Sequence, residues 1–260
     1  MLFEPPRSQY DLHFRIFDFP VRVHPLFWLI AVLLGISGGT KGTPPVKLLV
    51  WVAAVFVSIV VHELGHTFMQ RRYGGRARIV LHSFGGLAIS EGEEQSPRSQ
   101  IEIALAGPMA GFLLAIVGFL LVRLSGHAIG WQSGSEIDFA AINADQVIAF
   151  PILFGQFFWE PYDSKAANYL VSSFMQINIL WGILNLLPLY PLDGGRVARE
   201  LLTIQQPHRG IILSLQLSMI TGGVVAVIGL FSGSLFMAFM FGYLAYINYR
   251  TYQSYSSSRW

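Results

Sequence analysis

The sequence predicts an all-α polytopic membrane protein with about six transmembrane helices and a short β-hairpin or extended re-entrant segment after the second helix. Of the 260 residues, 53% are hydrophobic and only 12% are charged, whereas an average soluble domain carries about 25% charged residues. The mean hydropathy is +0.52. The apolar residues also gather in runs close to the ~20 residues that a membrane helix needs.

Six apolar runs of this kind follow one another along the chain. The last two are separated only by the tight turn "FSGS", so we expect them to form a helical hairpin. The expected spans cover residues 23–40, 46–70, 101–124, 167–190, 210–231 and 233–250.

Two connecting segments need a separate interpretation. Residues 71–100 contain "RIVLHSF" and "GLAIS" around a glycine pair, which predicts short extended strands. Residues 147–159 are apolar but too short to span and are interrupted by Pro151, so we interpret them as a re-entrant or interfacial segment on the outer face.

The distribution of arginines predicts the orientation in the membrane. With six spans, most arginines fall on one side, and the positive-inside rule places both termini in the cytoplasm. We expect a multi-pass protein of a prokaryotic cell membrane.

The composition also restricts the partners and cofactors. The chain has no cysteine, so a metal would have to be bound by His, Asp or Glu. A net charge of +2 without a dense basic run gives no reason to expect a nucleic-acid partner. The expected partner is the lipid bilayer, and the sequence does not determine the oligomeric state.

The segment "HELGH", residues 62–66, carries the most specific chemical pattern. On a helix, His62 and His66 lie on one face with Cβ atoms about 5–6 Å apart, which suits two imidazoles on one zinc ion. Glu63 could take a proton from an attacking water and return it to the leaving amine. The alternatives are a chance match or a hydrogen-bonded pair of polar helix residues. The apolar surroundings favour the metal site, because ionisable groups inside a membrane are costly.

A catalytic zinc usually has three protein ligands, and Glu102 and Asp193 are the remaining acidic candidates in the expected spans. Glu102 opens the third span, where a carboxylate is ordinary. Asp193 closes the fourth span in "NLLPLYPLDGGR", where two prolines must unwind the helix. Irregular backbone inside a membrane is tolerated where it lines a polar cavity. Asp193 is therefore the better candidate for the third ligand of one Zn²⁺ per chain.

Other polar residues of the expected spans have less specific roles. The amide of Asn185 could donate a hydrogen bond to an oxyanion or equally to a neighbouring helix. For Asn178, a hydrogen bond between helices is the expected role. His24 and His82 each stand alone near an expected interface, where hydrogen bonding explains them better than metal binding.

With these motifs, the sequence resembles the site-2 protease family of intramembrane zinc metalloproteases. The family pairs H-E-x-x-H on one span with N-x-x-P-x-x-P-x-D-G on a later span. Here the second pattern is filled without a gap by Asn185, Pro188, Pro191, Asp193 and Gly194.

The resemblance implies roles for the candidate residues. His62, His66 and Asp193 would bind zinc, Glu63 would act as general base and acid, and Asn185 would help to hold the substrate or an oxyanion. The substrate would be a transmembrane helix of another protein, cleaved near its cytoplasmic end in regulated intramembrane proteolysis. Many family members carry an asparagine where this chain has Gly111, which leaves a polar detail of the third span open.

The resemblance also suggests a domain organisation, with residues 1–260 forming one transmembrane metalloprotease domain without a PDZ or nucleotide-sensing domain. The alternative function is a non-catalytic membrane zinc-binding scaffold or a metal transporter. A transporter should carry ionisable groups along a path across the bilayer, whereas this chain concentrates them at one depth.

Overall fold

The structure is a computed structural model that describes residues 4–37, 44–83, 85–134, 146–152 and 154–257. The apolar runs form its long helices, and specific residues mark where these helices start. Pro45 stands at the first turn of α2, and Ser96 caps α3 by accepting a hydrogen bond from the Ser99 amide. The four long helices are α2 (Pro45–Arg72), α3 (Pro97–Leu124), α8 (Gly210–Phe231) and α9 (Leu235–Ser257).

Shorter helices connect or precede the long ones. A continuous helical stretch from residue 165 to residue 185 contains a π-helical segment, a feature often found at functional sites. The shorter elements are α1 (Pro25–Ser37), α5 (Lys165–Gln176), η1 (Ile177–Trp181), α6 (Gly182–Asn185) and α7 (Asp193–Gln205).

The expected six membrane spans are only partly found. Three described helices, α2, α3 and α8, are long and apolar enough to cross a membrane. Helix α1 has 13 residues, which is about 20 Å of helix against a hydrocarbon core of about 30 Å. The expected span 167–190 ends as a helix at Asn185, because the proline-containing segment that follows cannot continue it.

The all-α prediction was wrong in one respect, because the described residues include two β-sheets. The first has the strand order β1-β2-β3-β4, with antiparallel pairs at both ends and a parallel pair between β2 and β3. Strands β3 and β4 form the expected hairpin after the second helix, whereas β1 and β2 were not expected. The bounds are β1 (Leu12–Ile16), β2 (Phe19–Val23), β3 (Arg76–His82) and β4 (Gly85–Glu91).

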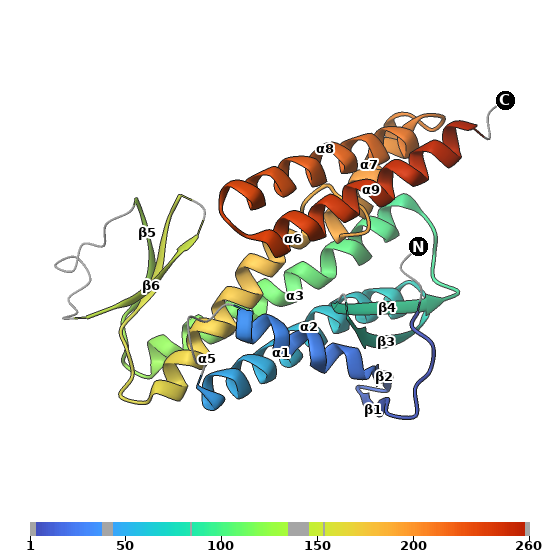
Figure 1. The fold of residues 1–260 in the computed structure, drawn as a ribbon. Coiled ribbons are helices and arrows are strands. Elements are labelled where there is room, and N and C mark those ends of the chain that lie inside the picture. The colour runs from blue at the N-terminus through green and yellow to red at the C-terminus, as the bar shows by residue number, and fades with distance from the viewer. Residues whose placement is uncertain (1–3, 38–43, 84, 135–145, 153, 258–260) are drawn as a thin grey trace.

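The second sheet accounts for the segment 147–159. This segment forms two antiparallel strands, and residues 129–133 pair with the second of them. It therefore contributes no membrane-spanning helix. In Figure 1 this sheet lies at the end of the molecule opposite the four-stranded sheet. Its strands are β5 (Ile129–Ser133), β6 (Ile148–Ile152) and β7 (Gly155–Trp159).

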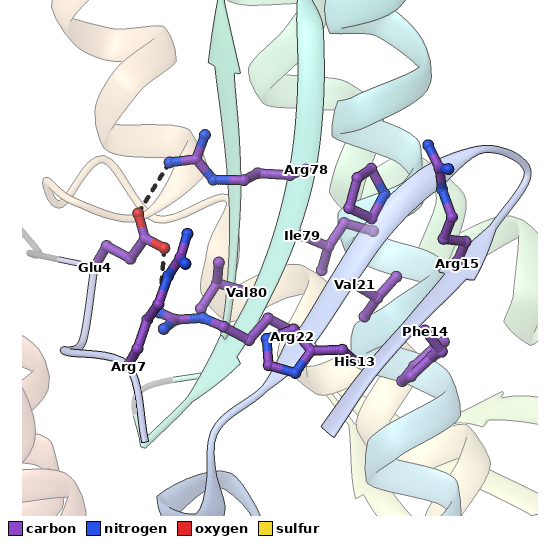
Figure 2. A pocket seen from close by; sticks show the side chains of 11 residues that line it. Glu4, Arg7, His13, Phe14, Arg15, Val21, Arg22, Arg78, Ile79 and Val80 are labelled. Carbon is purple, nitrogen blue, oxygen red and sulfur yellow. Dashed lines mark hydrogen bonds and ion pairs between the residues drawn. The ribbon is translucent and has the colours of Figure 1, made fainter. Parts of the chain in front are cut away.

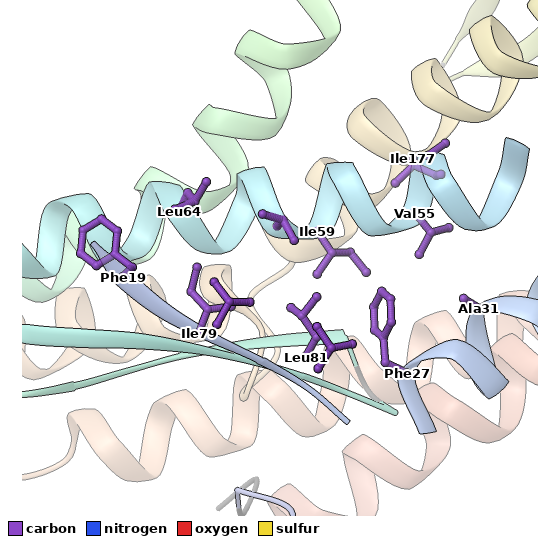
Figure 3. Close-up of a cluster of buried hydrophobic side chains, with 13 residues drawn as sticks. Phe19, Phe27, Ala31, Val55, Ile59, Leu64, Ile79, Leu81 and Ile177 are labelled. Carbon is purple, nitrogen blue, oxygen red and sulfur yellow. The ribbon is translucent and has the colours of Figure 1, made fainter. Parts of the chain in front are cut away.

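The four-stranded sheet packs against α2, and this contact forms a continuous apolar core (Figure 3). Val21 and Ile79 are register partners on adjacent strands and are almost fully buried. They belong to one buried cluster with Ile59 and Leu64 of α2 and Phe27 of α1. The sheet and α2 thus support each other where "HELGH" lies.

Candidate metal centre

Helix α2 presents His62, Glu63 and His66 to the protein interior. All three side chains are buried. One potential ligand atom from each lies within 4.8 Å of the others, so this group could hold a metal ion. The i, i+4 spacing brings the two rings together with centroids 4.8 Å apart.

Asp193 joins the two histidines from a distant part of the chain. It is the first residue of α7 and is buried. One of its carboxylate oxygens, Oδ2, lies 3.1 Å from Nε2 of His62 and 3.3 Å from Nε2 of His66. The two Nε2 atoms are themselves 3.1 Å apart. Three donor atoms from two helices therefore converge on one point.

The orientation of the His66 ring is fixed by helix α3. Its Nδ1 lies 2.7 Å from the main-chain carbonyl oxygen of Ile103. A carbonyl can only accept, so Nδ1 carries a proton, and in the neutral ring Nε2 is then the nitrogen with the lone pair that a metal needs. Metal-binding histidines usually show this arrangement, in which the second ring nitrogen donates to a carbonyl or carboxylate.

Two glycines let neighbouring elements approach the cluster closely. A Cβ atom at Gly107 of α3 would collide with Nε2 of His66 and lie 2.7 Å from Nε2 of His62. A Cβ atom at Gly86 of β4 would collide with the Glu63 carboxylate. The glycines thus enclose a compact site. Two imidazole nitrogens and one carboxylate oxygen, without thiolates, form a donor set that zinc accepts.

The turn that carries Asp193 is held from two sides by side chains that sequence reasoning missed. The main-chain N–H of Tyr190 donates to the hydroxyl of Ser218 in α8 at 2.9 Å. The amide of Asn248 in α9 donates to the carbonyl oxygen of Tyr190 at 2.6 Å. Both Ser218 and Asn248 are almost fully buried. Polar residues inside the two expected spans 210–231 and 233–250 were the available signal.

The other candidate residues lie outside this cluster. Glu102 accepts hydrogen bonds from Tyr73 and Arg98 at 2.5 and 2.9 Å, which gives it a structural role. His82 is buried in β3, and burial lowers its pKa, followed by the nearby charges of His24 and Arg22.

The two asparagines also differ in their surroundings. Asn178 donates to the hydroxyl of Ser58 in α2 at 2.8 Å, which is the expected bond between helices. Asn185 is buried at the end of α6. Among the described residues, the close contacts that join His62, His66 and Asp193 do not include it.

A small cavity of about 10 Å³ adjoins the cluster. It is lined by Ser58, His62 and Asn178, and Gly111 of α3 faces the same space. A Cβ atom at Gly111 would lie 3.7 Å from the side-chain oxygen of Asn178. The polar detail that the sequence left open at Gly111 is therefore a glycine facing a polar side chain from η1.

Comparisons with known proteins identify the family of the chain. The model of peptidase family M50 matches residues 50–230. A zinc metalloprotease of Methanocaldococcus jannaschii is 26% identical over 226 residues, which cover 86% of this chain and 54% of that protein. The stage IV sporulation protein FB of Bacillus subtilis is 24% identical over 191 residues, covering 73% of this chain and 50% of that protein. The chain thus spans about half the length of these curated relatives.

A solved structure shares the fold. The site-2 protease from Methanocaldococcus jannaschii aligns with a TM-score of 0.55 and 23% identity, covering 94% of this chain and 95% of that one. The fold similarity and the family match agree with the His62–Glu63–His66 group, which could hold a metal ion. The chain belongs to peptidase family M50, the site-2 protease family of zinc metalloproteases.

Proposed function

We propose that the chain is an intramembrane zinc endopeptidase that cleaves transmembrane helices of other membrane proteins near the cytoplasmic side. The observation that carries this proposal is the convergence of Asp193 on His62 and His66, at 3.1 and 3.3 Å, although 131 and 127 positions separate them along the chain. Two remote motifs would then build one zinc site per chain, with Glu63 beside it.

The roles of the side chains follow from their chemistry. Zinc, when bound, would supply a Lewis acid that polarises the scissile carbonyl and acidifies water. His62, His66 and Asp193 would hold the metal, and the bond between His66 and the Ile103 carbonyl would keep the imidazole in the ligating tautomer. The Glu63 carboxylate would accept a proton from the attacking water and deliver it to the amine nitrogen as the C–N bond breaks. Asn185 would donate its amide hydrogen to the carbonyl oxygen as negative charge develops there.

The position of the site along α2 suggests the depth of cleavage. His66 lies six residues before Arg72, the end of α2, which is about 9 Å of helix. Arg71 and Arg72 would mark the cytoplasmic end by the positive-inside rule. In this arrangement both termini are cytoplasmic, and α1, the helical stretch 165–185 and α9 complete six membrane passages in a prokaryotic cell membrane.

The alternative is a membrane protein that binds zinc without catalysis, as a scaffold or a transporter. Glu63 distinguishes these possibilities, because it is not required as a ligand in the three-residue site. It is nevertheless buried next to the cluster, and β4 encloses it through Gly86. Keeping an extra buried carboxylate is costly unless it has a function, which favours the peptidase.

The test compares cleavage with zinc content in the same preparations. The chain and its Glu63→Gln variant are coexpressed with a panel of tagged single-span membrane segments, and each purified protein is analysed for zinc. We expect the variant to keep about one zinc per chain and to lose cleavage by roughly 100-fold or more. The exposed Glu94→Gln variant is the matched control and should cleave normally. Equal cleavage by Glu63→Gln would overturn the assigned role of Glu63, and zinc binding without cleavage of any segment would favour the scaffold.

A further inference from the structure

A groove rich in arginine lies on the four-stranded sheet, away from the metal centre. It has a volume of about 470 Å³ and is lined by strands β1, β2 and β3 and by the segment that precedes β1. Figure 2 shows Arg7, Arg22 and Arg78 gathered around Glu4, with His13 beside Arg22. The register explains this arrangement, because His13 pairs with Arg22 across β1 and β2, and Arg22 pairs with Val80 of β3.

The groove carries an excess of positive charge. Its lining contains four arginines, and Glu4 is the one acidic residue among the described lining residues. Outside the lining, Asp11 contacts Arg22 at 3.3 Å and Glu91 contacts Arg78 at 3.4 Å, so these two carboxylates offset part of the positive charge. Guanidinium groups clustered at this density repel one another unless an anion lies between them.

Arg22 is the most unusual member of this cluster. Its side chain is only 8% exposed. One terminal nitrogen donates to the Pro5 carbonyl at 2.8 Å, and the two terminal nitrogens contact Glu4 and Asp11. Its Nε is buried and has no hydrogen-bond partner among the described residues. Buried donors normally have a partner, so Arg22 keeps one hydrogen-bonding group unused beside a groove that its side chain lines.

Glu4 occupies the position that an external anion would take. Its two carboxylate oxygens reach two different guanidinium groups, at 3.2 Å from Arg22 and 3.0 Å from Arg78. Glu4 and Arg78 are 35% and 39% exposed, so this ion pair is screened by solvent and is easily exchanged. A phosphate group carries more charge and more acceptor oxygens than a carboxylate, and it matches the planar guanidinium fork equally well.

We propose that this groove binds a phosphate-bearing anion, with Arg7, Arg22 and Arg78 as the recognition residues and Glu4 as an internal competitor that the phosphate displaces. The phosphate could belong to a lipid headgroup or to a soluble phosphate compound, because both present the same oxygens. The exposed aromatic side chains of Tyr10 and Phe17 flank the same sheet edge and suit a position at the membrane interface. The site is separate from the peptidase chemistry, so neither proposal depends on the other.

The experiment measures binding to the purified full chain in a neutral detergent. The probes are inorganic phosphate and a short-chain phosphatidic acid, with a short-chain phosphatidylcholine as the zwitterionic comparison of zero net charge. The readout is a saturable rise in the unfolding temperature. The variants are Arg7→Gln, Arg78→Gln and Glu4→Gln. The control Arg123→Gln removes the same charge at the far end of α3. Arg22 is left unchanged because it is buried.

The variants should change affinity in opposite directions. We expect phosphate affinity to fall about tenfold in Arg7→Gln and Arg78→Gln, to rise severalfold in Glu4→Gln, and to stay unchanged in Arg123→Gln. Binding of inorganic phosphate would support a soluble ligand, whereas saturable binding of phosphatidic acid alone would support a lipid headgroup. Absence of saturable binding to both phosphate probes, or equal loss in Arg78→Gln and Arg123→Gln, would overturn the proposal.

Discussion

The imidazole Nδ1 of His66 lies 2.7 Å from the carbonyl oxygen of Ile103, so helix α3 supports a metal-centre residue of α2 directly. Four residues later on α3, Gly107 lies so close to the same two histidines that a Cβ atom there would collide with them. The contact and the missing Cβ are one turn apart on α3 and therefore face the same side. Close packing of α2 on α3 is thus a condition for the geometry of the centre.

Replacing Gly107 with alanine should disturb the metal centre. The new methyl group would collide with Nε2 of His66, so α3 or the imidazoles must move. We expect a loss of about 1–3 kcal/mol in stability together with weaker zinc retention under mild chelation. Gly223→Ala in α8 is the matched control, because a Cβ there meets nothing within 4 Å. Normal zinc retention in Gly107→Ala would show that the centre tolerates the methyl group.

Removal of the Asp193 carboxylate should release the metal. Asp193→Ala takes away the oxygen that lies near both histidines. Losing an outer partner of a metal ligand already costs 10- to 100-fold in affinity, so we expect a loss of more than about 100-fold. Elemental analysis of the purified protein during dialysis against a chelator measures this loss, and the exposed Asp163→Ala variant serves as the control. Equal zinc content in Asp193→Ala would point to Glu63 as the third ligand, because its carboxylate lies within 4.8 Å of ligand atoms of both histidines.

Loosening the turn before Asp193 should weaken metal binding without removing a ligand. Ser218→Ala and Asn248→Ala each delete one side-chain bond to the main chain of Tyr190. We expect each variant to lose about 1–3 kcal/mol of stability and to bind zinc up to about tenfold more weakly. Thr251→Ala is the control, since among the described residues its hydroxyl bonds to the Ile247 carbonyl of its own helix and not to another element. If Ser218→Ala and Asn248→Ala bind zinc as tightly as Thr251→Ala does, the two hydrogen bonds to Tyr190 contribute to folding alone.

His82 should make the fold less stable in mild acid. Burial lowers its pKa from the ordinary value of 6.5. Below pH 6.5 the unfolded chain takes up a proton at His82 that the folded chain does not, so stability falls as the pH drops from 6.5 to the folded pKa. The slope from this one group is at most about 1.4 kcal/mol per pH unit. Unfolding temperatures at about pH 7.5 and about pH 5.5 should differ less in His82→Gln than in the parent chain or in the exposed His208→Gln control. An unchanged difference would assign the acid sensitivity to other groups.

The long helices α2 and α8 could be predicted because their signals are local. The expected span 46–70 became α2 (Pro45–Arg72), and 210–231 agrees with the bounds of α8. Prolines, serine caps and glycine turns mark such boundaries within a few residues of the helix itself. The meeting of "HELGH" with Asp193 was also expected, because Asp193 was the preferred third ligand for a zinc ion bound by His62 and His66.

The first sheet could not be predicted, because its central pairing is not local. Val21 pairs with Ile79 in parallel, and two helices lie between them along the chain. A five-residue strand such as "FPVRV" carries too little pattern to indicate a partner so far away. Helix α7 had a usable signal that was missed. The segment "RVARELLTIQ" has apolar residues at helical spacing. It follows Asp193, an acidic first-turn residue, after two glycines.

The two hydrogen bonds on Tyr190 have a mechanical consequence for the α8–α9 hairpin. Both helices bind the same residue, α8 through the N–H of Tyr190 and α9 through its carbonyl oxygen. Any outward swing of the hairpin would therefore strain or break these bonds and pull on the strand of backbone that ends in Asp193. If a substrate helix entered by displacing the α8–α9 hairpin, the Asp193 carboxylate would lose its support during substrate binding. Helix α1 packs on α2 and makes no such bond to Tyr190 among the described residues, so its displacement would leave the three donor atoms in place.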